Sequence, residues 1–172
     1  MAHISRGEGA SSLDVRWVNP QNIHLTLVFL GNIPSERIED LGLAVEEACK
    51  GCAPLSAHLH GMGFFPGKGS PRVLWIGLEG DIERMGGFRD DVQNRLKPFG
   101  IRQEKRPYRP HLTLGRFRKS GRRNRLLDDF LLKNGDLASN SVVFDALYLY
   151  KSDLRREGPI YTRLASWPLS GS

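Results

Sequence analysis

Hydrophobic and polar residues alternate along much of this chain with a period of two, which is typical of β-strands. The stretches with this alternation, or with a short apolar run between turn residues, are residues 14–18, 22–30, 55–62, 72–78, 110–117, 139–150 and 160–168. Other stretches repeat apolar residues at helical spacing, which predicts helices over residues 34–50, 81–98 and 124–133. Because helices are followed by strand pairs rather than in strict alternation, the pattern favours an antiparallel α+β fold over a doubly wound parallel sheet.

Glycine and proline mark the predicted breaks between these elements. Residues 63–71 are rich in both and are expected to form a loop. Residues 1–13 are small and polar and are predicted to form a flexible N-terminal tail. The remaining residues, 14–172, are long enough to bury a hydrophobic core and are predicted to form a single domain.

One four-residue word occurs twice, as His24-Leu25-Thr26-Leu27 and as His111-Leu112-Thr113-Leu114. At average residue frequencies, a given word recurs by chance in roughly one chain in a thousand of this size. A proline shortly precedes each copy, and each copy lies on a predicted strand, so its His and Thr should point to one face and its Leu residues to the core. The spacing between the copies is near half the chain, which predicts two similar lobes.

Two imidazoles beside two hydroxyl groups suit acid–base chemistry on a phosphate. A neutral imidazole can take a proton from a nucleophile, while a charged one gives a proton to the leaving group. Thr26 and Thr113 can donate hydrogen bonds to phosphate oxygens, and Arg116 can contact the developing charge. No acidic cluster suits Mg²⁺, so we predict metal-independent phosphodiester cleavage by His24 and His111, without a cofactor. A single His-x-Thr strand is usually only a half-buried polar pair, and the repetition is what favours a catalytic site.

Composition and charge add a candidate partner and a compartment. The chain has 172 residues, 40% of them hydrophobic and 26% charged, with a net charge of +6, which is compatible with a polyanionic partner. Basic residues surround the second motif: Arg102, Lys105, Arg106, Arg109, Arg116, Arg118, Lys119, Arg122, Arg123 and Arg125. The sequence has no apolar run of membrane-spanning length and no apolar signal-peptide segment, so we expect a cytoplasmic protein without a membrane partner.

Cys49 and Cys52 form a Cys-x-x-Cys that allows a different interpretation. The spacing fits a redox pair or half of a zinc site, and His58 and His60 could complete four ligands. We favour a structural explanation, in which Cys49 lies at a helix C-terminus capped by Gly51 and the two histidines form the polar side of a strand.

Several segments of the chain resemble a known family. They are Arg-Trp-Val-Asn-Pro-Gln-Asn-Ile-His-Leu-Thr-Leu-Val-Phe-Leu-Gly, then Gly-Phe-Phe-Pro, then Val-Leu-Trp-Ile-Gly-Leu, then Arg-Pro-His-Leu-Thr-Leu-Gly-Arg, and the tail from Leu147 to Pro168. Together these segments resemble the two-histidine phosphoesterases, and most closely the RNA 2′,3′-cyclic phosphodiesterases first named 2′-5′ RNA ligases. The double His-Leu-Thr-Leu is the specific part of this resemblance, and the tail is the weaker part.

The resemblance implies a bilobal α+β fold with a central cleft between two antiparallel sheets and helices outside. It implies hydrolysis of 2′,3′-cyclic phosphates at RNA or nucleotide ends to a 2′-phosphate, with possible reverse 2′-5′ joining and no obligatory protein partner. It also implies that His111 is the base, His24 the acid, and that Thr26, Thr113 and Arg116 hold the phosphate.

Some alternatives stay open at the level of sequence. The same cleft could bind a nucleotide or RNA end without turnover, although a pure binder would not need both histidines. The aromatic residues that could stack on a base are Phe64, Phe65, Tyr108 and Phe117, unless they pack in the core. Family members usually carry an apolar strand and a helix before the Arg-Trp-Val segment, so the polar residues 1–13 predict a shortened start and an exposed sheet edge.

Overall fold

The computed structural model describes residues 13–67, 69–118, 125–156 and 158–172. The strands in it are β1 (Val15–Trp17), β2 (Leu55–Phe65), β3 (Val73–Gly80), β4 (His111–Phe117), β5 (Val142–Phe144), β6 (Ala146–Arg155) and β7 (Gly158–Pro168). The α-helices are α1 (Ile38–Lys50), α2 (Ile82–Leu96) and α3 (Arg125–Asn134), and single 3₁₀ turns cover Pro20–Asn22, Ser35–Arg37 and Lys97–Phe99.

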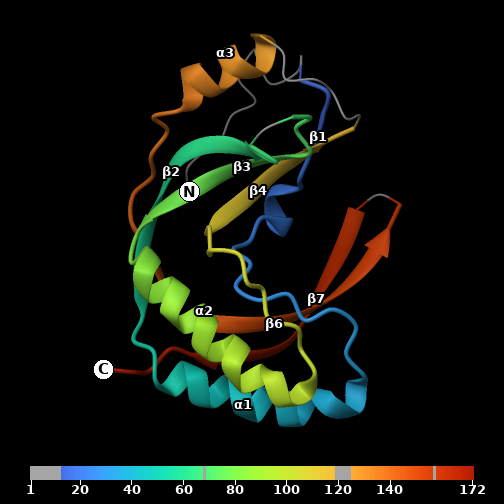
Figure 1. Cartoon of the computed structure of the whole chain (residues 1–172), viewed down its shortest axis with the longest axis vertical. Helices are drawn as coiled ribbons and strands as arrows, with labels where there is room; N and C mark the ends of the chain where they lie inside the picture. Colours follow the sequence, from blue (N-terminus) through green and yellow to red (C-terminus); the bar gives the residue numbers. More distant parts are fainter. Residues whose placement is uncertain (1–12, 68, 119–124, 157) are drawn as a thin grey trace. The chain divides into compact units, whose positions relative to one another are not determined.

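The strands form two sheets. One has five strands in the order β1-β4-β3-β2-β5, and the other is the hairpin β6-β7 (Figure 1). The pairs β1–β4, β3–β4, β2–β5 and β6–β7 are all antiparallel, which confirms the predicted antiparallel α+β fold.

The chain divides into two compact units. Unit 1 takes its residues from Met1–Thr26, His58–Gly80 and Arg109–Ser141, and unit 2 from Leu27–Ala57, Asp81–Tyr108 and Val142–Ser172. Both histidines and both threonines of the repeated word therefore belong to unit 1. The single two-lobed domain with a central cleft stays a prediction, and the predicted tail lies almost wholly outside the described residues.

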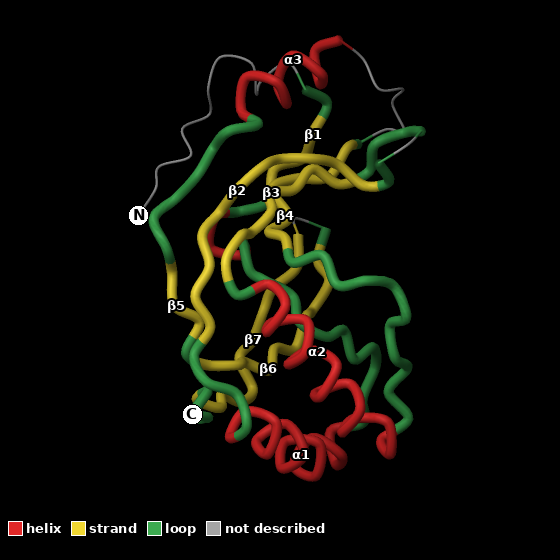
Figure 2. The backbone as a smooth tube through the Cα atoms, turned by 60° about the vertical axis from the view of Figure 1, so that its left-hand side comes forward, coloured by secondary structure: helices red, strands yellow, loops and turns green. Residues whose placement is uncertain are grey.

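The core of unit 1 lies between one face of its sheet and α3. It consists of seven buried residues: Leu13, Val15, Phe64, Leu74, Ile76, Leu114 and Leu127. Leu127 enters this core from α3, and Phe130 and Leu131 of the same helix pack against it. Figure 2 shows β2, β3 and β4 side by side in this sheet. Because this face carries the apolar residues, the polar side chains of the strands lie on the opposite face.

Unit 2 is built from α1, α2 and the β6-β7 hairpin. The two helices pack against each other, and α1 also packs on β7, where a Cβ at Gly42 would lie 3.3 Å from the Trp167 ring. The chain end closes the C-terminus of α1, because Ser170 N donates to Cys49 O (3.2 Å) and Gly171 N to Cys52 O (3.0 Å). The first bond ends on a carbonyl in the last turn of α1, and the second on Cys52, just beyond the cap Gly51.

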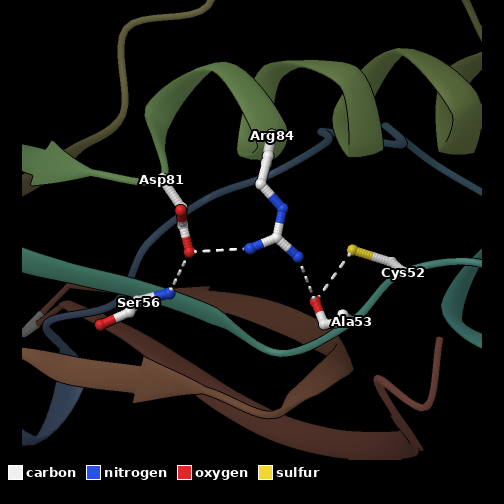
Figure 3. A network of polar contacts seen from close by, with 5 residues as sticks. All are labelled: Cys52, Ala53, Ser56, Asp81 and Arg84. Carbon is white, nitrogen blue, oxygen red and sulfur yellow. Dashed lines mark hydrogen bonds and ion pairs between the residues drawn. The ribbon is translucent and has the colours of Figure 1, made fainter. Parts of the chain in front are cut away.

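A small polar network joins the start of α2 to the residues that lead from α1 into β2 (Figure 3). Asp81 Oδ2 accepts hydrogen bonds from Ser56 N (2.8 Å) and from an Arg84 guanidinium nitrogen (2.9 Å). The other terminal nitrogen of Arg84 donates to Ala53 O at 3.4 Å, and this carbonyl also accepts from Cys52 Sγ. The network fixes where β2 begins relative to α2 within unit 2.

Three sequence-based element predictions were wrong in detail. The segment predicted as a strand over residues 22–30 makes only one isolated bridge, at Leu25. The predicted strand over residues 139–150 is two strands, because the chain changes partners at Asp145: β5 pairs with β2 and β6 with β7. The predicted loop over residues 63–71 starts later, since β2 continues to Phe65.

Among the described residues, no helix has both the length and the apolar character needed to span a membrane. Large apolar side chains do remain exposed on the β6-β7 hairpin, at Tyr148, Tyr150, Leu154, Ile160 and Leu164.

Candidate active site

The two copies of the repeated word lie side by side in unit 1. Leu25 and Leu112 form an antiparallel bridge, which places His24 opposite Thr113 and Thr26 opposite His111. Directly opposed residues of an antiparallel pair point to the same face, so all four polar side chains share the face away from the core. Diagonal neighbours in such a pair lie roughly 7–8 Å apart, a spacing that admits one phosphate group between the two imidazoles. One isolated bridge therefore links the two motifs within unit 1.

The neighbour of β4 on its other side is β3, and the register between them explains where Arg116 lies. Leu74 pairs with Gly115 but Trp75 pairs with Thr113, so Leu114 is an extra residue, a β-bulge. The bulge turns both Leu114 and Gly115 toward the core. Arg116 then pairs with Val73, which lies on the same face of β3 as Trp75. Arg116 consequently shares the face of Thr113, although strict alternation would put it on the opposite one.

Both histidine rings are held by a hydrogen bond to a backbone carbonyl two residues earlier. His24 Nδ1 lies 2.8 Å from Asn22 O, and His111 Nδ1 lies 2.7 Å from Arg109 O. A carbonyl oxygen can only accept, so in both rings Nδ1 carries the hydrogen. The lone pair of each neutral ring is then on Nε2, which fixes the atom that can take up or release a proton.

A proline precedes each of the two histidines. Pro20 begins the 3₁₀ turn before His24, and Asn19 Oδ1 caps that turn by accepting from Gln21 N at 3.1 Å. Pro110 is buried directly before β4, a position where its missing N–H costs no ladder hydrogen bond. In both segments the carbonyl that accepts from the ring lies two residues before the histidine.

His111 is also enclosed by aromatic rings on this face. The Phe65 ring meets it edge to face with centroids 5.0 Å apart, and the Trp75 ring lies 6.3 Å away. Phe65 and Trp75 contact each other at 5.2 Å. Gly63 makes room for the indole, because a Cβ there would lie only 2.4 Å from Trp75 Cζ2.

The four aromatic residues that the sequence offers for stacking on a base lie in different surroundings. Phe64 is buried in the core of unit 1, and Phe117 packs against that core. Tyr108 stacks under the Arg89 guanidinium, and burial raises its pKa to about 12. Of the four residues, Phe65 is the one for which the structure gives a contact with a motif histidine. Trp75 was missed, and its signal was its place on β3, the strand that pairs with the second motif.

The described basic residues around the second motif lie in different surroundings. Arg106 is paired with Glu104, and its hydrogen bonds hold the pKa of that carboxyl at about 2. Arg125 faces Asp129 on α3 at 3.8 Å. Arg116 and Arg118 are exposed on unit 1, whereas Lys119, Arg122 and Arg123 lie outside the described residues.

The cysteines and the histidines of β2 belong to different environments. Burial raises the pKa of the Cys49 thiol to about 11 and also raises that of Cys52, the opposite of what activates a redox pair. His58 Nε2 and His60 Nδ1 both face the Glu79 carboxylate, at 3.4 and 3.3 Å. Within the described part of the chain, no group of three or more His, Cys, Asp or Glu side chains is arranged to hold a metal. The helix-end explanation for Cys49 is confirmed, since α1 ends at Lys50 with Gly51 as its cap.

Comparison with known proteins places the chain in a family. The profile of the 2′-5′ RNA ligase superfamily matches residues 5–156. The chain is 31% identical to the RNA 2′,3′-cyclic phosphodiesterase of Thermotoga maritima, over 98% of this chain and 84% of the relative. It is 32% identical to the corresponding protein of Aeropyrum pernix, over 95% and 92%. The chain belongs to the 2′-5′ RNA ligase superfamily.

Solved structures agree with this assignment. The crystal structure of the protein TT0787 of Thermus thermophilus superimposes with a TM-score of 0.73 at 26% identity, covering 92% of this chain and 84% of that one. The structure of E. coli LigT complexed with 3′-AMP gives a TM-score of 0.72 at 23% identity, covering 96% and 87%, and supports the fold.

Proposed function

We propose that this protein hydrolyses the 2′,3′-cyclic phosphate at an RNA or nucleotide end to a 2′-phosphate. The observation that carries the proposal is the matched pair of histidines beside the Leu25–Leu112 bridge, each with Nδ1 bound to its own backbone and Nε2 as the proton-exchanging atom. The curated relatives that are 31% and 32% identical to this chain are RNA 2′,3′-cyclic phosphodiesterases, which supports the same reaction here.

The reaction needs two proton transfers, and the two imidazoles supply both. In the neutral state, His111 Nε2 takes a proton from the attacking water while the water oxygen bonds to phosphorus. The bond from phosphorus to the 3′ oxygen breaks, and protonated His24 gives its Nε2 proton to that oxygen. The products are a 2′-phosphate and a free 3′ hydroxyl. The hydrogen bonds from Nδ1 to the backbone are alike in the two rings, so they do not distinguish the base from the acid. The base role of His111 and the acid role of His24 therefore rest on the family resemblance.

The remaining polar residues of this face bind the phosphate. Thr26 and Thr113 stand directly opposite His111 and His24, so their hydroxyls are placed to donate to the non-bridging oxygens. Arg116, brought to this face by the bulge, adds a cation that stabilises the charge developing on those oxygens. With general acid, general base and charge stabilisation all provided by side chains, the proposed reaction needs no metal.

The test is turnover of adenosine 2′,3′-cyclic phosphate in EDTA, with product identification by chromatography. The wild type should form the 2′-phosphate, and His24→Ala and His111→Ala should each lower kcat by about 100-fold or more, since positioned acid–base groups contribute this much. His58→Ala is the matched control, because it removes an imidazole from β2 that faces Glu79 rather than the motifs. A wild type that binds a 2′-nucleotide but never turns over the cyclic substrate would instead identify a binding module.

The same geometry allows 2′-5′ joining. A 5′ hydroxyl in place of water would attack the cyclic phosphate with His111 as base and His24 as acid, leaving a 2′-5′ linkage and a free 3′ hydroxyl. The proposal predicts that His24→Ala and His111→Ala lose hydrolysis and joining together.

A further inference from the structure

Next to the two histidines, the polar face of unit 1 carries a pair of arginines. In the β1–β4 register, Arg16 stands directly opposite Arg116, between the pairs Val15–Phe117 and Trp17–Gly115. Val15 lies in the core, and Trp17 and Phe117 pack against it, so those two pairs face inward. The side chains of Arg16 and Arg116 therefore leave the sheet on the face of His111 and Thr113, and both are exposed.

Placing two guanidinium groups directly opposite each other has a cost in a sheet. Like charges at such positions weaken the strand pair. The next position outward brings Asp14 beside Arg118, since Arg118 N donates to Asp14 O at 3.0 Å. Among the described residues, the polar face at this end of the sheet therefore carries Arg16, Arg116 and Arg118 with one acid, Asp14. A planar guanidinium binds phosphate through two parallel hydrogen bonds, which makes a phosphate group the ligand that best fits the pair.

The spacing indicates which phosphate this is. Thr113 pairs with Trp75 and Arg116 with Val73, so the arginine pair lies two strand positions from the Thr113 row, roughly 7 Å along the sheet. Across that distance the long side chain of Arg116, which is on the strand of His111 and Thr113, can reach back to the cyclic phosphate. Arg16 is on the neighbouring strand β1 and can instead meet the next phosphodiester of an RNA chain, which is joined to the reacting nucleotide through its ribose.

We propose that Arg16, beside Arg116, forms a second phosphate subsite that binds the phosphodiester on the 5′ side of the reacting nucleotide. Through this subsite the enzyme prefers RNA ends to free cyclic mononucleotides. The proposal rests on the function proposed above and names the substrate class within it. Arg16 is a specificity-determining residue here and takes no part in the proton transfers.

The experiment compares two substrates that differ by one adenosine and its phosphodiester: adenosine 2′,3′-cyclic phosphate and the dinucleotide ApA ending in the same cyclic phosphate. The wild type should show a higher kcat/KM for the dinucleotide. Arg16→Gln should lower the dinucleotide-to-mononucleotide ratio of kcat/KM by about tenfold, the effect of one charged hydrogen-bonded contact. The salt dependence of dinucleotide binding should also become shallower by about one phosphate contact.

Arg72→Gln is the matched control. Arg72 is exposed and lies opposite Phe117, since Phe117 N donates to Arg72 O, so its side chain leaves the same end of the sheet on the other face. This variant removes the same charge and should leave the substrate ratio unchanged. Equal losses on both substrates in Arg16→Gln, or equal ratios in the two variants, would overturn the proposal.

Binding measurements separate this proposal from the reaction itself. The ligands are 2′-AMP and the dinucleotide ApA with a terminal 2′-phosphate, followed by tryptophan fluorescence. If the wild type fails to turn over either cyclic substrate, the proposed function falls, while a selective loss of dinucleotide affinity in Arg16→Gln still supports the subsite. If turnover is normal and Arg16→Gln binds both ligands as the wild type does, the subsite is refuted and the function stands.

Discussion

Gly63 lies against the Trp75 ring, and that ring lies against His111. Gly63→Ala tests whether these contacts matter for catalysis. An added Cβ would lie 2.4, 2.8 and 2.9 Å from Cζ2, Cη2 and Cε2 of Trp75, all in the six-membered ring of the indole. Carbon atoms in ordinary contact are about 3.5–4.0 Å apart, so the indole has to move by roughly 1 Å. Gly63 is not among the glycines with positive φ, so the strain is steric and not conformational.

The displaced indole contacts both Phe65 and His111, so we expect the imidazole to shift with it. A misplacement near 1 Å can lower a rate by about 100-fold, so kcat should fall by roughly 10- to 100-fold. KM should change much less, because the proton transfers are made in the transition state. Overpacking of this kind should also lower the free energy of unfolding by about 1–3 kcal/mol.

The measurements are steady-state kinetics on a cyclic nucleotide, urea unfolding, and the NMR shift of the His111 ring, which the two aromatic rings influence. Gly63→Ala combined with Trp75→Phe should recover part of the loss, because phenylalanine lacks the ring atoms that clash. Gly87→Ala on α2 is the control: nothing lies within 4 Å of its added Cβ, so it should raise stability by about 0.5–1 kcal/mol. If Gly63→Ala keeps kcat within twofold while the His111 signal moves, the aromatic contacts do not position the imidazole for catalysis.

Two further predictions concern other parts of the molecule. Thr113→Val keeps the shape of the side chain but removes its hydroxyl, so it should lower kcat/KM for the cyclic nucleotide about tenfold. Thr113→Ser keeps the hydroxyl and should retain most of kcat/KM. Equal losses in the two variants would point to packing instead of hydrogen bonding. Because burial raises the pKa of Cys49 from 9.0 to about 11, the buried thiol favours the folded state below pH 9, and this contribution is lost as the pH rises toward 11. Urea unfolding between pH 8 and pH 10.5 should therefore show falling stability that is less steep in Cys49→Ala, and parallel curves for the two proteins would contradict the assignment.

The hydrophobic pattern was sufficient to predict most of the fold, because period-two alternation and helical spacing report which side of an element is buried. It predicted α1, α2, β3 and β4 closely. It failed over residues 22–30, where the alternation is real but a partner strand is lacking. β1 already occupies β4 from Gly115 to Phe117, and after Thr26 the chain passes into unit 2, so a single bridge at Leu25 is what remains.

For the candidate site, too, the sequence pattern predicts which residues belong together, whereas strand pairing decides how they are oriented. The repeated word was enough to predict His24, Thr26, His111 and Thr113 as one group, and the structure brings them to one face. The orientation of Arg116 could not be read from the sequence, because only the β3–β4 register reveals that Leu114 is an extra residue. The role of Trp75 was equally hidden, since an aromatic residue in an apolar run looks like part of the core until its strand partner is known.

The backbone bonds of the two histidines bear on protein engineering. Each ring obtains its tautomer from a carbonyl two residues earlier in the same segment. Transplanting the pair to another scaffold therefore requires two short peptides in antiparallel register, each with a proline shortly before its histidine. A designer could build a proton-donating and a proton-accepting group into a two-stranded frame from local sequence alone.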